Sequence, residues 1–195
     1  MFKVGTVELN YFDHPNNVTY QNERRVEIPL GAYFLSKFPA ATEVGCVLPH
    51  YGWDKHEIID LTDTHPKNIR ANALHWDYKG KDVFSISTLE HFMTREYANG
   101  SNDDSIICLN KIIAEAKNYL VTFPTCYNEF LHGYIKTSSH PRRLLKRINI
   151  ENHWEVTTED FVDFEFGHRD FRVPDGVFNN ANAIWIVTNL PEFHV

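Results

Sequence analysis

Two residues in the first third of the sequence are placed where a nucleoside-binding site would need them. Gly45 lies in the apolar run 42–48, and Asp60 lies in a second apolar run, 57–61. We predict both runs to be strands of an α/β sheet, in which ligands bind beyond the carboxyl ends of the strands. A glycine there lets a ligand approach the backbone closely, and an acid accepts hydrogen bonds from the two hydroxyls of a ribose.

The spacing of these two residues bears on the kind of ligand. They are fifteen residues apart, whereas the dinucleotide fingerprint places its acid about 20 residues after the glycines. Val47 also stands where that fingerprint has its second glycine. A pyrophosphate needs those glycines to reach a helix N-terminus. The pattern therefore argues against NAD and is neutral for an adenosine ligand without phosphate.

Two further polar residues are predicted to follow strands. Asp77 ends the segment 72–77, which we interpret as the third strand, and Ser87 ends the apolar run 82–87. Both are candidates for contacts to a ligand at the same sheet edge. For Asp77 the sequence favours a solvated loop carboxylate equally.

Glu90 and His91 come directly after this run and could carry acid–base chemistry. The pKa of a histidine suits the removal of a proton from a hydroxyl group near neutral pH. Glu90 could orient His91, or the pair could join a metal site. The alternative is the start of a helix, with Thr88 as its cap and Glu90 near its positive end.

No metal site is predicted. None of the 11 histidines lies in an H-x-x-x-H or H-E-x-x-H pattern, and no two of Cys46, Cys108 and Cys126 form a C-x-x-C. Three cysteines without a framework indicate reduced thiols. The basic run 142–147 could hold an anionic acceptor, although such a run is more often a solvated helix face.

The elements that must position these residues follow from hydrophobic periodicity. Helical spacing predicts helices over 23–38 and 103–118, with Pro29 either in a first turn or at a break. Further strands are predicted at 119–123 and 183–188, and 154–166 could supply another, antiparallel strand. Short apolar strands separated by helices favour an α/β fold with a mostly parallel sheet.

Net charge and the lengths of the apolar runs limit the classes of function that are possible. The formal net charge of -7 disfavours a duplex nucleic-acid partner, because an acidic chain gains nothing from counterion release. No apolar run approaches the ~20 residues that span a bilayer, and residues 1–5 lack a signal-peptide core. We therefore expect a soluble, cytoplasmic protein with one domain over 1–195, in which 1–22 is a lead-in flap or a loose segment. The oligomeric state is left open.

Four motifs, in this order, carry a resemblance to a known family. They are E-R-R-V-E-I-P (Glu23–Pro29), E-V-G-C-V-L-P-H-Y (Glu43–Tyr51), I-I-D (Ile58–Asp60) and I-S-T-L-E-H (Ile86–His91). Over about 23–124 the sequence resembles the class I S-adenosylmethionine-dependent methyltransferases, and among them a group of small proteins associated with polysaccharide gene clusters. The resemblance implies a Rossmann-like methyltransferase fold, with helices flanking the sheet and a C-terminal antiparallel strand.

The resemblance also implies S-adenosylmethionine as the cofactor and gives roles to residues near it. Glu43 and Gly45 would shape the pocket for the methionine end of the cofactor. Asp60 would hold the ribose hydroxyls, and Ser87 would lie beside the sulfonium.

The adenine and acceptor ends are assigned in the same way. Asp77 would meet the adenine amino group, with Leu74 or Trp76 lining the ring. Glu90 and His91 would face the acceptor as catalytic residues. The expected reaction is O-methylation of a small hydroxylated acceptor, such as a sugar or glycan.

Two departures from the family keep other functions open. The proline-glycine-glycine turn before the fifth strand is absent from 115–119, and the first loop has a single glycine. One alternative is a binding or regulatory protein that kept the fold and lost turnover. The other is a Rossmann-type enzyme that uses a nucleotide sugar.

Overall fold

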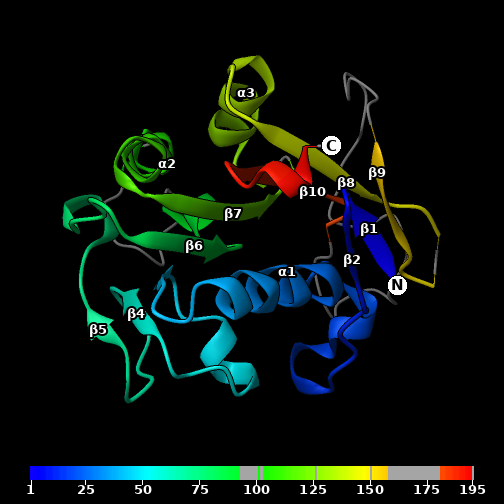
Figure 1. Ribbon diagram of the computed structural model, residues 1–195, viewed down its shortest axis with the longest axis horizontal. Coiled ribbons are helices and arrows are strands. Elements are labelled where there is room, and N and C mark those ends of the chain that lie inside the picture. The colour runs from blue at the N-terminus through cyan, green and yellow to red at the C-terminus, as the bar shows by residue number, and fades with distance from the viewer. Residues whose placement is uncertain (93–100, 102, 126, 150, 158–180, 195) are drawn as a thin grey trace.

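The centre of the molecule is one eight-stranded sheet with the strand order β5-β4-β3-β6-β7-β10-β8-β9 (Figure 1). The computed structural model describes residues 1–92, 101, 103–125, 127–149, 151–157 and 181–194. The strands of this sheet are β3 (Thr42–Val44), β4 (Glu57–Asp60), β5 (Ile69–Arg70), β6 (Asp82–Ile86), β7 (Asn118–Pro124), β8 (Arg142–Arg147), β9 (Trp154–Thr157) and β10 (Ala183–Thr188).

The first five strands of this sheet are parallel, and the last ones mix directions. Parallel pairs join β3 to β4 and β6, β4 to β5, and β6 to β7. The strand β10 is antiparallel to both of its neighbours, β7 and β8, and β9 is antiparallel to β8. From β3 the chain adds strands first on one side and then on the other. The topological switch point, where open α/β sheets bind ligands, therefore lies beyond β3 and β6.

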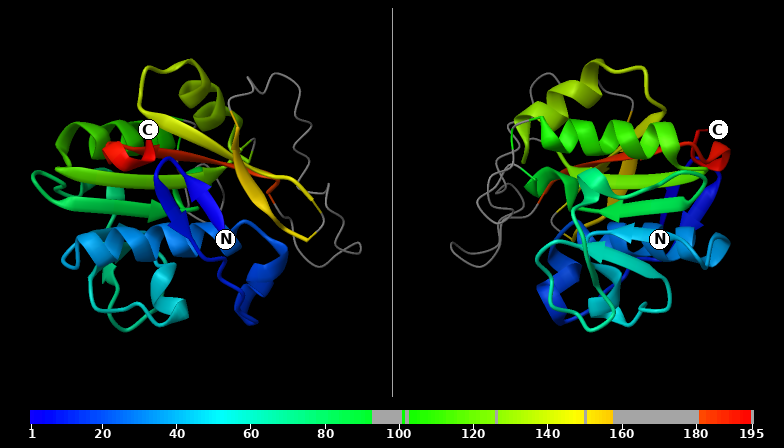
Figure 2. Two further views of the ribbon diagram at one scale, coloured as in Figure 1. Left: turned by 45° about the vertical axis from the view of Figure 1, so that its right-hand side comes forward. Right: turned by 90° about the vertical axis from the view of Figure 1, so that its left-hand side faces the viewer.

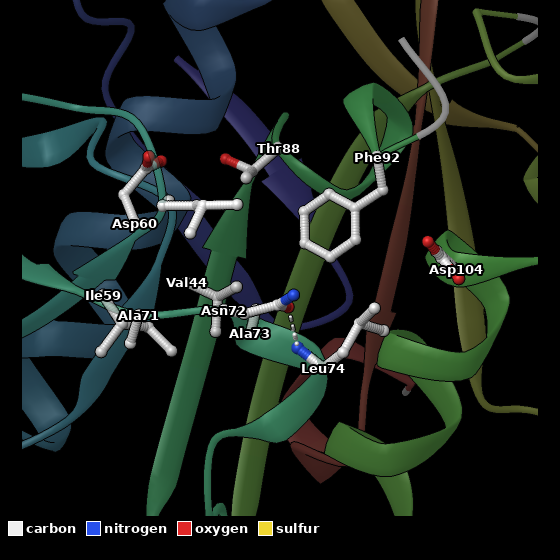
Figure 3. Close-up of a pocket in the computed structure, with 12 residues that line it drawn as sticks. Val44, Ile59, Asp60, Ala71, Asn72, Ala73, Leu74, Thr88, Phe92 and Asp104 are labelled. Atoms are coloured by element: carbon white, nitrogen blue, oxygen red, sulfur yellow. Dashed lines mark hydrogen bonds between the residues drawn. The ribbon is translucent and has the colours of Figure 1, made fainter. Parts of the chain in front are cut away.

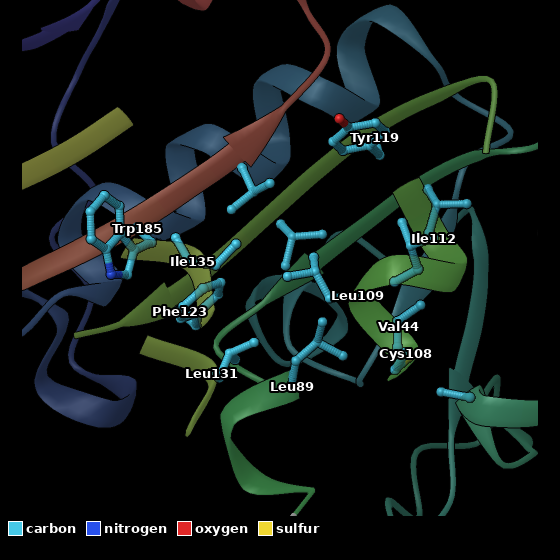
Figure 4. Close-up of a cluster of buried hydrophobic side chains, with 14 of the residues drawn as sticks. Val44, Leu89, Cys108, Leu109, Ile112, Tyr119, Phe123, Leu131, Ile135 and Trp185 are labelled. Atoms are coloured by element: carbon cyan, nitrogen blue, oxygen red, sulfur yellow. The ribbon is translucent and has the colours of Figure 1, made fainter. Parts of the chain in front are cut away.

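Helices cover both faces of the sheet, as Figures 1 and 2 show. They are α1 (Arg24–Lys37) on one face, and α2 (Asp104–Glu115) and α3 (Glu129–Thr137) on the other. Phe34 of α1 packs with Phe84 of β6 in one buried cluster. Leu109 of α2 and Val121 of β7 belong to a second cluster across the sheet (Figure 4). The prediction of a mostly parallel α/β sheet flanked by helices is confirmed.

Pro29 lies inside α1 without breaking it, so the expectation of a break or a first-turn position was wrong. Proline has no N–H to donate to the carbonyl of Arg25, one turn earlier. The amide of Phe12 donates to that carbonyl instead, at 3.0 Å. The helix therefore continues to Lys37 with the freed acceptor satisfied from outside.

Residues 1–22, expected to be a lead-in flap or a loose segment, are packed on the core. A hairpin of β1 (Phe2–Val4) and β2 (Val7–Leu9) leads to a 3₁₀ turn at 16–21. Phe2 and Val4 are buried in the cluster beneath α1. The amide of Thr6 donates to the carbonyl of Glu192 at 2.9 Å, which ties the hairpin to the C-terminal segment.

One strand prediction and one helix interpretation were wrong, and a further strand prediction is confirmed in part. The third strand is β5 at 69–70, not 72–77, where residues 73–75 form a 3₁₀ turn. The basic run 142–147 is the strand β8, not a helix face, because Leu144 and Leu145 pair with β10 and are buried. Of 154–166, residues 154–157 form β9, and 158–166 lie outside the described residues.

Candidate functional site

A cavity opens at the switch point, beyond the carboxyl ends of the parallel strands (Figure 3). The space between its walls, which is continuous with open solvent, amounts to about 430 Å³. The residues that line it are Val44, Gly45, Ile59, Asp60, Leu61, Ala71, Asn72, Ala73, Leu74, Thr88, Phe92 and Asp104.

The lining is apolar with a few polar groups, and its charge has one sign. Both charged side chains among these described lining residues are acids, Asp60 and Asp104. Phe92 and Leu74 project toward the space between them in Figure 3. Such a wall suits a ligand with a flat apolar part and a neutral or cationic part. It does not suit a pyrophosphate, which needs basic groups or a glycine-rich turn.

Gly45 is required by its surroundings. Its φ is +91°, and a Cβ atom at this position would lie 2.1 Å from Thr88 Oγ1. Its amide donates to the carbonyl of Ile59 at 2.8 Å, which draws the loop toward β4. The glycine ends β3 at Val44, earlier than the predicted 42–48 strand, and brings the first loop against Thr88 at the cavity wall.

Glu43 supports this loop from beneath and does not line the cavity. The fully buried carboxylate accepts the amides of Val47 at 3.0 Å and Leu48 at 2.9 Å. Its second oxygen lies 2.7 Å from His56 Nε2. Burial raises the pKa of Glu43, although the hydrogen bond with His56 acts in the opposite direction. Glu43 is thus a positioning residue for the loop that carries Gly45.

Asp60 does lie in the cavity wall, as its place at the end of β4 predicts. Its Oδ1 accepts the amides of Thr62 at 2.7 Å and Asp63 at 2.9 Å, and the Thr62 hydroxyl at 3.1 Å. These bonds fix the orientation of the carboxylate with only 7% of the residue exposed. The site therefore contains a buried acid that is held by its own loop.

Asn72 stands where the sequence analysis placed no site residue. Because β5 ends at Arg70, residues 71–74 follow that strand and line the cavity. Asn72 Oδ1 accepts the amide of Leu74 at 2.9 Å, the dashed line in Figure 3. An apolar pattern marks neither residue of β5, so only the sheet pairing reveals that Asn72 follows a strand.

Asp77 and Trp76 lie outside the cavity. Asp77 is exposed, and its Oδ1 accepts the amide of Lys79 at 3.1 Å. The ring of Trp76 packs beside the core cluster under α2, with Lys81 Nζ 5.0 Å from its centroid. Both were expected in the site because 72–77 was predicted to be a strand, which the structure does not contain. Leu74, the other predicted contact of the adenine ring, does line the cavity.

Ser87 faces the other side of the sheet edge, toward α1. Its φ is +38°, which turns the chain directly after β6. Its hydroxyl lies 2.7 and 2.8 Å from the two carboxylate oxygens of Glu27. Thr122 at the end of β7 donates to the same carboxylate at 2.8 Å, and Arg24 Nη1 lies 3.5 Å from it.

We call Arg24, Glu27, Ser87, Glu90 and Thr122 the polar cluster. Glu90 is 1% exposed, and burial followed by the charge of Glu27 raises its pKa well above the ordinary range. Its Oε2 has no hydrogen-bond partner among the described residues. The cluster thus holds a second, closed set of charges beyond β6 and β7.

The predicted catalytic pair lies next to the cavity but not in its lining. Glu90 and His91 belong to the 3₁₀ turn 89–91, and Thr88 and Phe92 on either side of them line the cavity. His91 Nε2 is 3.7 Å from Glu90 Oε1, and its side chain is 26% exposed. Of the two, His91 is the one that solvent or an acceptor can reach.

Comparison with protein-family models, curated proteins and solved structures finds no match to this chain. Within the described residues, no helix has the length and apolar character to cross a membrane.

Proposed function

We propose that this chain is an S-adenosylmethionine-dependent methyltransferase and that the cavity at the switch point binds the cofactor. The observation that carries the proposal is the convergence of Gly45, Asp60 and the 71–74 segment on one apolar cavity. They come from the ends of three parallel strands that are consecutive in the chain. The acidic lining favours a cationic sulfonium over a phosphorylated ligand, which weakens the nucleotide-sugar alternative.

For each part of the cofactor, the cavity wall offers residues that could hold it. Leu74 and Phe92 would line the adenine ring, and Asn72 would accept a hydrogen bond from its amino group. The ribose hydroxyls fit the carboxylate of Asp60, because a buried acid accepts both of them. Gly45 would shape the pocket for the methionine end by letting the first loop pack against Thr88, which occupies the space that a Cβ atom would take.

The sheet supports the same reading. Its five parallel strands have the order of the first five strands in the dinucleotide-binding fold, 3-2-1-4-5. The sixth position differs, because the antiparallel β10 is inserted between β7 and β8. A C-terminal antiparallel strand is what the resemblance to class I methyltransferases implies. The topology thus favours a Rossmann-like methyltransferase fold over a dinucleotide-binding one.

When bound, S-adenosylmethionine would supply an electrophilic methyl group for transfer to an acceptor oxygen. The chain's task is then mainly positioning. His91 is placed to receive the acceptor's hydroxyl proton, because its side chain is partly exposed beside the cavity. Glu90 suits this role less, since its raised pKa favours the protonated form.

The acceptor is proposed to be a small hydroxylated molecule, such as a sugar, and the place of action the cytoplasm. Both rest on the resemblance. The free thiols of Cys46 and Cys108 are compatible with a reducing compartment.

Calorimetric titration with S-adenosylmethionine and S-adenosylhomocysteine tests the proposal. The matched variants are Asp60→Asn, which keeps an oxygen for the loop amides, and Asp77→Asn, which changes an exposed acid outside the cavity. We expect Asp60→Asn to weaken binding by ~10–100-fold, the value of a hydrogen bond to a charged group. Asp77→Asn should bind like wild type.

Three outcomes would contradict parts of the proposal. Absence of binding by either ligand at millimolar concentration would overturn the methyltransferase assignment. Tight binding without methyl transfer to a broad panel of sugars and other alcohols would favour the non-catalytic alternative. Equal weakening by the two variants would show that the ribose is not held by Asp60.

A further inference from the structure

Three side chains of metal-binding type converge beside the cavity. The sulfur of Cys46, a ring nitrogen of His50 and a carboxylate oxygen of Asp63 all lie within 4.8 Å of one another. His50 Nε2 is 3.0 Å from Asp63 Oδ2. Thiolate, imidazole and carboxylate are ligands of Zn²⁺, and three protein ligands leave the fourth tetrahedral position for water.

The surroundings hold Asp63 in place before any ion arrives. Asp63 Oδ1 accepts the amide of His65 at 2.7 Å, which leaves Oδ2 turned toward His50. The amide of Asp63 donates to Asp60 Oδ1 at 2.9 Å. Hydrogen bonds of this kind orient the carboxylate ligands of metal sites.

Access and charge also fit a cation. The side chains of His50 and Asp63 are 46% and 25% exposed, whereas Cys46 is buried. An ion can therefore enter from solvent on the histidine side. Burial, followed by the negative charges of Asp63, Glu43 and Asp60, raises the pKa of the Cys46 thiol well above its ordinary value, so the thiol is neutral in the free protein. A divalent ion compensates this charge and takes the thiol as thiolate, releasing its proton to water.

We propose that Cys46, His50 and Asp63 bind one Zn²⁺ ion, which holds the segment 45–50 against the loop 60–63. The sequence has no C-x-x-C and no H-x-x-x-H pattern, and for that reason no metal site was predicted. The pattern here is C-x-x-x-H in the first loop, with the acid from the second. The two loops also carry Gly45 and Asp60, so on the proposed function the ion stiffens the cofactor cavity.

Cobalt titration of the chelator-treated protein tests the site without any cofactor. We expect one equivalent of Co²⁺ to bind, with the strong visible absorption of four-coordinate cobalt and a sulfur-to-cobalt charge-transfer band. Competition by Zn²⁺ should abolish both signals. Absence of uptake by the wild-type chain overturns the proposal.

Variants separate the site from adventitious binding. Cys46→Ser should lose the charge-transfer band and at least ~10-fold in Zn²⁺ affinity, whereas Cys108→Ser changes a buried thiol in the α2 core and should keep both. His50→Gln should weaken binding similarly, whereas His75→Gln, at another exposed histidine, should not. Circular dichroism checks each fold. A charge-transfer band that survives in a folded Cys46→Ser variant overturns the assignment.

The link to the cavity has its own readout. Zn²⁺ should raise the affinity for S-adenosylhomocysteine several-fold in the wild-type chain, and S-adenosylhomocysteine should raise the Zn²⁺ affinity by the same factor. Equal cofactor affinity with and without Zn²⁺ overturns the stiffening role. Because the cobalt titration uses no cofactor, failure of the metal site and failure of the methyltransferase proposal are distinguishable.

Discussion

The cavity and the polar cluster lie beyond the carboxyl ends of the same sheet and are built differently. The cavity is lined by residues at the ends of β3, β4 and β5 and by Thr88 and Phe92 after β6, and Asp60 in its wall is held by the amides of its own loop. The polar cluster lies on the side of α1, and Glu27 there is held by the side chains of Ser87 and Thr122. One acid borders empty space and the other is enclosed by its partners.

This difference shows that a strand's carboxyl end is not by itself a binding site. An acid held by backbone amides keeps its place while one side still faces a ligand. An acid shared among side chains from α1, β6 and β7 joins those elements, and removing it affects all of them. We therefore expect changes in the cavity to alter ligand binding and changes in the polar cluster to alter stability.

The largest effect is expected from Glu27→Leu. This change removes the acceptor of two buried hydroxyls, those of Ser87 and Thr122, and the ion-pair partner of Arg24. Breaking a buried pair from one side costs ~3–5 kcal/mol. Urea unfolding should show a fall of that size in the free energy of unfolding.

Glu27→Gln is the matched control, because its amide oxygen can still accept from one hydroxyl. It should lose clearly less stability than Glu27→Leu. If Glu27→Leu unfolds within 1 kcal/mol of wild type, the polar cluster does not hold α1 to the sheet, and the contrast with the cavity fails.

A smaller effect, on both stability and binding, is expected from Gly45→Ala. The new Cβ atom would lie 2.1 Å from Thr88 Oγ1, and overpacking of this kind costs ~1–3 kcal/mol. Gly52 has a similar φ of +95° with nothing within 4 Å of its Cβ position. Gly52→Ala therefore isolates the backbone strain, about 1 kcal/mol. The difference between the two variants in thermal unfolding measures the clash with Thr88, and equal losses would contradict it.

The sequence was informative about the fold wherever an element buries a regular apolar face. The helix predicted at 23–38 is α1, and the one at 103–118 contains α2, because their apolar residues recur at helical spacing. β5 has two exposed residues and no such pattern, so only its pairing with β4 defines it. β8 mixes basic and apolar residues, and likewise only its pairing with β10 and β9 identifies it as a strand.

The candidate site was predictable only where a residue's strand was placed correctly. Gly45 and Asp60 follow β3 and β4, and both line the cavity. Asp77 was assigned from a strand that does not exist, and this error hid Asn72. Ser87 follows β6 as predicted, but its positive φ directs the hydroxyl to Glu27. The local turn after a strand thus decides whether a side chain points toward the cavity or toward α1.

The smallest effect, and the one that changes with pH, is expected from Glu90→Gln. Burial and the charge of Glu27 raise the pKa of Glu90 above its unfolded value. Between those two pKa values the folded state binds more protons than the unfolded state, so stability falls as pH rises. The glutamine variant lacks this penalty and should be more stable than wild type at pH 8, by about 1 kcal/mol or ~2–4 °C in Tm. The gain should vanish near pH 4.

Glu57→Gln is expected to change stability in the opposite direction at high pH. Although burial opposes it, hydrogen bonds from Lys81 and Thr42 lower the pKa of Glu57. Its contribution is present above the unfolded pKa and is lost as pH falls through the folded one. Glu57→Gln should therefore lose a little stability at pH 8, and this loss should shrink as the pH falls below the unfolded pKa. If Glu90→Gln instead gains the same stability at every pH, its effect comes from packing rather than charge. The raised pKa of Glu90 would then not distinguish the polar cluster from the cavity.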